Sequence, residues 1–179
     1  FAKRSFQVAA AFGFASICST IVLGDESGYS VGLAQQTKLA AMEAMWETEP
    51  APADFNLIAG INEAEQKNDW HVSIPYAMGI IGTRSLDKEI IGIHDIKALN
   101  EKRIINGIQA VSLLDQLRED RTNPQTIAQF EKVKKDLGFG LLLKKYTDDV
   151  TKATPEMIKK ATDDTIPPIF PMFWSFRIM

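Results

Sequence analysis

The chain has apolar stretches at its two ends and a polar middle. Residues 6–23 carry no charged side chain, and 18 residues rising about 1.5 Å each would span roughly 27 Å as a helix. This length predicts a membrane-spanning helix over residues 1–24. Residues 166–179 are again apolar and aromatic, which predicts the start of a second membrane helix. The alternative for the first run is a secretory signal peptide, and the chain would then be a secreted helical binding domain.

The polar middle is predicted to be mainly helical. Residues 31–47 form an amphipathic pattern that ends before two prolines, whereas the polar residues 53–70 predict a loop. Residues 71–93 mix β-branched residues with glycines and predict an extended or turn-rich segment. Three further helices are expected to start at Asp95, at Asn123-Pro124 and at Thr154-Pro155, the first of them ending near Glu119. The expected inward-facing positions are Ile104, Ile108, Val111, Leu114 and Leu117 in the first of these helices, and Ile127, Phe130, Val133, Leu137 and Leu141 in the second.

These elements predict a mainly α fold, that of a fragment of a polytopic helical membrane protein with a helical extracytoplasmic loop domain. Lys3 and Arg4 precede the first apolar run and Asp25 and Glu26 follow it, so the positive-inside tendency places the residues after it outside the membrane. The apolar ends predict that the chain is a piece of a longer protein.

The charge argues against nucleic-acid binding, and the cysteine content excludes disulfides and cysteine metal sites within one chain. From Asp25 to Asp164 the chain has 17 basic and 23 acidic residues, a net charge of −6, which argues against nucleic acid as a partner. Cys18 is the only cysteine, so neither an internal disulfide nor a cysteine metal site can form within one chain.

Four charged residues after the first apolar run are candidates for acid–base chemistry. Asp25 and Glu26 are expected in a turn at the outer end of the membrane helix, next to a hinge at Gly28. Lys38 and Glu43 would lie about 140° apart around the next helix, where both could reach one ligand. A carboxylate can accept a hydroxyl proton and an ammonium can orient an oxygen, as the oxidation of a quinol requires. The alternative is that these are solvated charges on an exposed helix.

The C-terminal run holds a second candidate pair. A methionine thioether such as that of Met179 can be an axial haem ligand, and Arg177 could bind a haem propionate or stabilise charge during electron transfer. The alternative is an ordinary apolar helix from which Arg177 extends to the membrane surface. His71 and His94 have no partners at metal-ligand spacing and are expected to be surface or structural residues.

At these residues the sequence resembles subunit I of the cytochrome bd quinol oxidases. The similar segments cover the whole chain and include GDESGY, TKLAAMEAMWETEPAP, SLLDQLR, KKDLGFGLLLKKYT and FRIM. The resemblance implies a transmembrane helix (residues 1–24), the N-terminal part of the quinol-binding loop (25–103), the C-terminal helical insertion of a long-type loop (104–165) and the start of the next transmembrane helix (166–179).

The resemblance also implies roles for individual residues. Lys38 and Glu43 match the quinol-binding lysine and glutamate, and Asp25 matches an acidic residue of the same site. Met179 matches the axial ligand of a low-spin haem b, and Arg177 matches the arginine beside that haem. The haem's other ligand, and those of a high-spin haem b and a haem d, are expected outside this chain.

The implied function is that of a terminal oxidase in the bacterial inner membrane. Membrane quinol, ubiquinol or menaquinol, would be oxidised at the periplasmic face, to which residues 25–165 would belong. The electrons would reduce O2 to water, generating a proton gradient without pumping. The implied partners are oxidase subunit II, small accessory subunits and membrane lipid. The fragment alone is expected to be inactive.

Overall fold

The structure, a computed structural model, describes residues 1–178, and Met179 lies outside the described residues. Its elements in chain order are α1 (Ala2–Ala34), α2 (Gln36–Met42), β1 (Phe55–Asn62), β2 (Lys67–Ile74), the π-helix η1 (Gly79–Thr83), α3 (Ile93–Glu119), α4 (Pro124–Val133), η2 (Lys134–Asp136), α5 (Leu137–Leu141), η3 (Leu142–Lys145), η4 (Val150–Lys152), α6 (Pro155–Asp163) and α7 (Ile169–Ile178). The mainly helical prediction is therefore confirmed.

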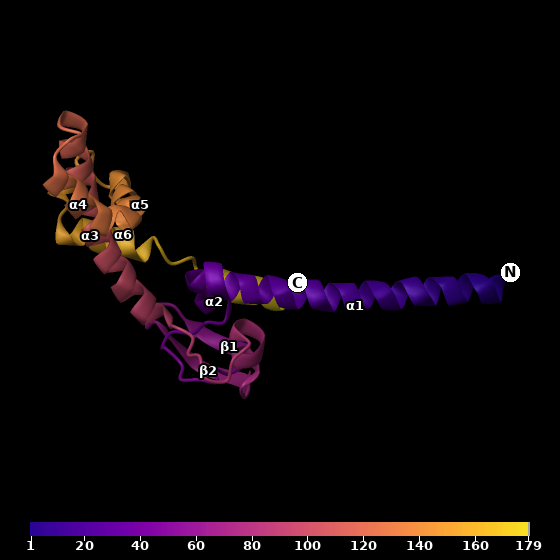
Figure 1. Cartoon of the computed structure of the whole chain (residues 1–179). Coiled ribbons are helices and arrows are strands. Elements are labelled where there is room, and N and C mark those ends of the chain that lie inside the picture. Colours follow the sequence, from indigo (N-terminus) through magenta and orange to yellow (C-terminus); the bar gives the residue numbers. More distant parts are fainter. Residues whose placement is uncertain (179) are drawn as a thin grey trace.

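Helix α1 is a single rod that projects far beyond the rest of the molecule (Figure 1). It is long and apolar enough to cross a membrane, and none of its residues is buried within the chain. The helix continues to Ala34, so the expected turn after Leu23 and the hinge at Gly28 are wrong. A glycine inside a helix costs only about 1 kcal/mol relative to alanine, which packing of the neighbouring turns can offset. Such packing exists at Gly32, where an added Cβ would lie 2.7 Å from the carbonyl oxygen of Gly82 in η1.

The helix expected over residues 31–47 is also wrong, because the chain bends at Gln35. This residue has φ −137° and ψ 59°, outside the helical region, and separates α1 from the short α2. Helix α2 thus starts a new direction at the base of α1 (Figure 1).

A β-hairpin replaces the loop that was expected over residues 53–70. Strands β1 and β2 pair antiparallel, from Phe55 with Ile74 to Asn62 with Lys67. The turn between them is stabilised where the Glu65 amide donates to the Asn62 side-chain oxygen at 3.1 Å. The segment that follows, 71–93, contains the end of β2, η1 and turns, as its glycines predicted.

Helix α3 connects the hairpin region to a helical insertion built from α4, α5 and α6 (Figure 1). Its N-cap is Gly92, three residues before the expected cap Asp95. The Asp95 side chain instead accepts a 2.5 Å hydrogen bond from the Thr48 hydroxyl. The N-caps predicted at Asn123 and Thr154 are confirmed, because both side chains accept hydrogen bonds from the first turn of their helices.

The insertion has its own small core, which the sequence predicted only in part. Ile104 is fully buried as expected, but Ile127 and Leu141 are exposed. The helix expected after Asn123 breaks at Val133 into short 3-10 and α turns, which changes the directions of the later side chains. The buried hydrophobic residues of this core are Ile104, Leu143, Val150 and Ala161.

A second, larger core lies where α2, the hairpin, the start of α3 and α7 meet. It includes Ala40, Met45, Ile93 and Phe173, each at most 2% exposed. Segments that are far apart in the sequence, α2 and α7, thus pack together, and this core surrounds the charged residues considered next.

Candidate functional site

The end of helix α2 places Glu43 in the larger core. Glu43 is the C-cap residue, and Ala44 after it has a left-handed backbone conformation with φ 49°. The amides of Ala44 and Met45 donate back to the carbonyl oxygens of Ala41 and Ala40, at 3.3 and 2.9 Å. This is the Schellman arrangement that ends helices, usually with glycine in the position that Ala44 occupies. The sharp reversal directs Glu43 inward, and its side chain is only 1% exposed.

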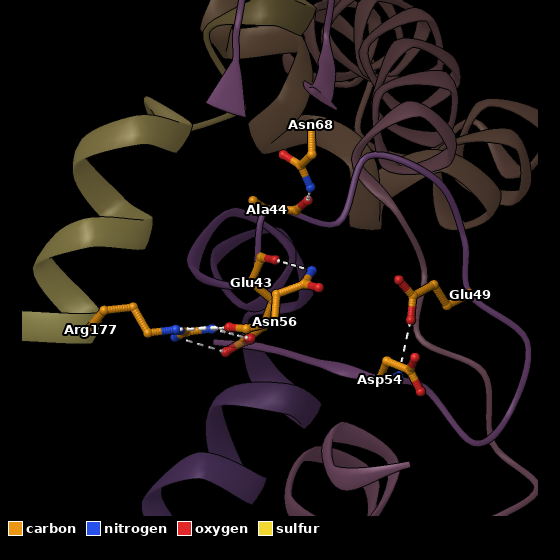
Figure 2. A network of polar contacts seen from close by, with 7 residues as sticks. All are labelled: Glu43, Ala44, Glu49, Asp54, Asn56, Asn68 and Arg177. Atoms are coloured by element: carbon orange, nitrogen blue, oxygen red, sulfur yellow. Dashed lines mark hydrogen bonds and ion pairs between the residues drawn. The ribbon is translucent and has the colours of Figure 1, made fainter. Parts of the chain in front are cut away.

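The buried Glu43 carboxylate pairs with an arginine from the far end of the sequence. Arg177 in α7 donates from Nη2 to Glu43 Oε2 at 2.6 Å and from Nη1 to Oε1 at 3.5 Å (Figure 2). The Arg177 side chain is 10% exposed. Its Nε also donates to the Asn56 carbonyl oxygen at 2.9 Å, as does Nη2. The structure therefore unites two of the residues that the sequence singled out, although 134 positions separate them.

Aromatic rings complete the surroundings of the Arg177 guanidinium. Its Cζ lies 4.5 Å from the ring centre of Phe55, 4.6 Å from Phe173 and 5.0 Å from Phe176. These distances allow cation–π attraction, which strengthens where water is excluded. The positive charge is thus held between one carboxylate, one carbonyl and three rings.

Two carboxylates near the site have raised pKa values. Burial raises the pKa of Glu43 above its ordinary value of 4.5, and the Arg177 hydrogen bond and charge oppose this only in part. Burial likewise raises the pKa of Glu49, against the hydrogen bond that it accepts from the Asp54 amide at 3.1 Å (Figure 2). A carboxylate with a raised pKa is a better proton acceptor, because its basicity lies closer to neutrality.

An apolar cavity of about 350 Å³ lies directly beside Glu43. Residues from α1, α2, β1, η1 and α7 line it: Gly24, Ser27, Gly28, Val31, Leu39, Met42, Glu43, Phe55, Met78, Ile81, Gly82 and Phe176. Among the described residues 1–178, Glu43 is the one ionisable group that lines the cavity. A mostly apolar pocket with few polar groups is typical of a small-molecule site.

Two glycines of α1 form one wall of this cavity. A Cβ added to Gly24 or Gly28 would meet no atom of the chain within 4 Å. The absence of side chains at these two positions leaves a flat stretch of helix facing the cavity. Larger residues there would reduce the space available to a ligand.

Asp25 takes part in a different cluster on the outside of this wall. Arg84, the C-cap of η1, pairs with Asp25 at 2.5 Å and with Glu26 at 2.8 Å. Its guanidinium also lies 4.3 Å from the ring centre of Tyr29. These contacts tie η1 to α1 along the cavity. The predicted grouping of Asp25 with Lys38 and Glu43 is therefore not seen.

The remaining predicted site residues have separate positions. Lys38 is exposed on α2 and does not line the cavity. Met179, the expected haem ligand, lies outside the described residues. His71 is exposed on β2, and His94 packs beside Trp46 with ring centres 6.0 Å apart, so both agree with the predicted surface or structural role.

Sequence reasoning missed two residues that this site uses. Arg84 follows an unremarkable glycine-rich segment, and Asn56 lay in a stretch expected to be a loop. The β-branched and aromatic residues Phe55, Ile58 and Ile61 were an available sign of the strand that carries Asn56.

Comparison with known proteins decides the family. The sequence model for "Cytochrome bd terminal oxidase subunit I" matches residues 1–179, the entire chain. The chain belongs to this family. Its apolar α1 is part of the match, which removes the basis for a secreted domain with a signal peptide.

Two curated members of the cytochrome bd family are similar to the chain. The cytochrome bd-II ubiquinol oxidase subunit 1 of Escherichia coli (strain K12) is 38% identical over 178 residues, covering 99% of the chain and 35% of that protein. The cytochrome bd ubiquinol oxidase subunit 1 of Bacillus subtilis (strain 168) is 26% identical over 102 residues, covering 57% of the chain and 22% of that protein. The chain thus spans about a third or less of these relatives.

Proposed function

We propose that this part of a bd-type terminal oxidase binds membrane quinol in the cavity beside Glu43 and accepts protons from it. The observation that carries the proposal is one buried carboxylate, paired with Arg177, in an otherwise apolar cavity of about 350 Å³. The relatives are ubiquinol oxidases by name, and a quinol is an apolar molecule whose reaction begins at hydroxyl groups. The cavity offers apolar walls for the ring and one acceptor for a hydroxyl proton.

The residues of the chain support this chemistry in distinct ways. A quinol that becomes a quinone loses two protons and two electrons. Glu43 lines the cavity, and its ionised carboxylate would accept a hydroxyl proton from a quinol bound there. Arg177 holds the carboxylate in place, and its hydrogen bond and charge oppose part of the rise in the pKa of Glu43 that burial causes. The glycines of α1 provide the flat wall against which a ring can lie.

The electrons would leave toward the end of α7. A b-type haem bound there would supply the one-electron acceptor that quinol oxidation needs. The family is one of cytochromes, and the buried cation of Arg177 lies two positions before Met179, the proposed ligand. A buried guanidinium fits such a group, because it lowers the energy of added negative charge nearby. High-spin haem b and haem d belong, in this proposal, to the rest of the enzyme.

The proposal places the site on the outer side of a bacterial inner membrane. Lys3 and Arg4 at the start of α1 indicate a cytoplasmic N-terminal end, so residues 25–165 would be periplasmic. Protons from quinol would be released outside, while O2 is reduced to water with protons from inside. The full protein would be polytopic and would bind subunit II, small accessory subunits and lipid. Lys38 and Asp25 stay predicted quinol-site residues.

Filling the glycine wall tests the proposed site. In the full-length oxidase, Gly28→Leu adds a side chain at the cavity wall, and its Cβ would meet no atom of this chain within 4 Å. We expect its KM for quinol to rise at least tenfold, measured as O2 consumption with a short-chain quinol. Gly138→Leu is the matched control, since that glycine also has no neighbour within 4 Å but lies on the insertion. Unchanged quinol kinetics in Gly28→Leu would refute the cavity as the quinol site.

A further inference from the structure

Asn56 joins the two charged residues of the site through both its side chain and its backbone. Its Nδ2 donates to the backbone carbonyl oxygen of Glu43 at 2.9 Å. Its own carbonyl oxygen accepts from Arg177 Nε at 2.9 Å and from Nη2 (Figure 2). Asn56 is only 4% exposed, so water does not compete for these bonds. One residue of β1 therefore contacts the end of α2 and the end of α7 at once.

A local irregularity of the hairpin makes this double contact possible. Asn56 pairs with Ser73 and Ile58 pairs with Val72, which leaves Leu57 as an extra residue in β1. Such a bulge bends the strand and changes the direction of its peptide groups. The Asn56 carbonyl can thus face Arg177 while the strand stays paired on both sides. Bulges of this kind are frequent next to active sites.

We infer that Asn56 is a positioning residue that fixes the Glu43 carboxylate and the Arg177 guanidinium relative to each other for quinol oxidation. The inference rests on the proposed function, because the carboxylate matters only if it accepts the proton. Asn56 does not line the cavity, so it acts through Glu43. Its loss should slow the reaction step and leave quinol binding nearly unchanged.

Asn68 provides a matched control in the same network. Its Nδ2 donates to the Ala44 carbonyl oxygen at 2.9 Å, and its Oδ1 accepts from Trp46 Nε1 at 3.0 Å. It therefore holds the backbone one residue after Glu43, from strand β2, by the same kind of bond. Within the described residues 1–178, Asn68 makes no hydrogen bond with Arg177. Replacement of Asn68 thus measures the effect of loosening the backbone after α2 without changing a bond to Arg177.

The test compares variants of the full-length oxidase by quinol kinetics. Asn56→Leu and the isosteric Asn56→Asp both remove the amide donor, and a displacement of the acceptor by about 1 Å can slow a reaction up to about a hundredfold. We expect kcat to fall at least tenfold in both, with KM within twofold and an unchanged haem spectrum after chemical reduction. Asn68→Leu should keep kcat within threefold. If the Asn56→Leu oxidase fails to assemble, the Asn56→Asp oxidase still provides the test.

A double-mutant cycle separates this inference from the proposed function. In a Glu43→Gln background, Asn56→Leu should cause no further loss of kcat, because both substitutions act on the same group. Wild-type kcat in both Asn56 variants would overturn the inference, as would an equal loss in Asn68→Leu or a further loss in the Glu43→Gln background. A wild-type rate in Glu43→Gln itself would instead overturn the proposed function.

Discussion

Replacing Glu43 by glutamine in the full-length oxidase removes the proposed proton acceptor while keeping the shape of the site. The glutamine oxygen can still accept from Arg177, whose other acceptor, the Asn56 carbonyl, is untouched. The substitution should therefore change chemistry more than structure. A positioned general base contributes about 100-fold to 10,000-fold to a rate, so we expect kcat for quinol to fall by that factor.

The pH dependence of the reaction gives an independent measure of Glu43. Burial raises the pKa of Glu43, so its ionised form appears only above the ordinary value of 4.5. Since the ionised form accepts the proton, the wild-type rate should rise with pH through this raised pKa. Folding stability changes in the opposite direction, because a raised pKa in the folded state means that stability falls as pH rises through it. In Glu43→Gln the acidic limb of the rate profile should disappear.

Arg177 sets the position of that limb. At a separation of about 4 Å between charge centres and an effective dielectric constant of about 20, the pair contributes about 4 kcal/mol to the ionised form. Arg177→Gln removes this contribution, so the pKa of Glu43 should rise further and the acidic limb should move to higher pH. The assay is O2 consumption with a soluble quinol at pH 5 to 9. A Glu43→Gln enzyme with at least a third of the wild-type kcat and an unchanged limb would refute the reasoning.

Two further predictions concern the elements around the site. Arg84→Gln should raise the KM for quinol about two- to fivefold at low salt, because η1 loses its exposed ion pairs with Asp25 and Glu26. Wild-type KM should rise with ionic strength and the variant's should not, and equal salt dependence in the two would contradict this role. Gly107→Val should destabilise the insertion by more than about 3 kcal/mol, since an added Cβ would lie 2.6 Å from the Asp136 carbonyl oxygen on a crossing helix. Limited proteolysis within 104–165 should detect this, with Gly138→Val as the control, and resistance equal to wild type would contradict it.

Local sequence signals predicted the helix starts but not the directions of the chain between them. Asn123 and Thr154 cap their helices with their own side chains, so a few neighbouring residues determine these starts. Gly28 and Gln35 show the opposite case. The helix continues through Gly28 and ends at Gln35, and the close packing nearby, of Gly32 against Gly82 in η1, joins residues that no local pattern links.

The hairpin was missed because β1 does not alternate regularly between apolar and polar residues, and β2 begins with the three polar residues Lys67, Asn68 and Asp69. Its exposed face carries Trp70 and Val72, while Asn56 lies on the buried side. This inverts the usual assignment of apolar residues to the inside, so hydrophobic alternation gave no clear signal. The inversion has a physical cause, since the buried side-chain amide of Asn56 donates to the Glu43 carbonyl oxygen and its backbone carbonyl accepts from Arg177.

The pairing of Glu43 with Arg177 could not be predicted from spacing. The two residues are 134 positions apart and belonged to two separate groups of candidates, one after the first apolar run and one in the C-terminal run. The resemblance also grouped Asp25 and Lys38 with Glu43, whereas the structure pairs Asp25 with Arg84 and leaves Lys38 exposed. The sequence thus identified the residues, and the structure supplied their contacts.

Stability alone does not explain why a carboxylate is buried at this point. Removing two charges from water requires several kcal/mol for each ion, and apolar residues of similar volume often replace a buried ion pair without loss of stability. The network around Glu43 also includes a left-handed Ala44 backbone, which is unfavourable for a residue with a Cβ. Both features oppose folding, and both place one acidic group at the wall of an apolar cavity. A fold that keeps two such unfavourable features at one point is best explained by chemistry there, which is why the carboxylate, and not the exposed charges of α2, is the proposed proton acceptor.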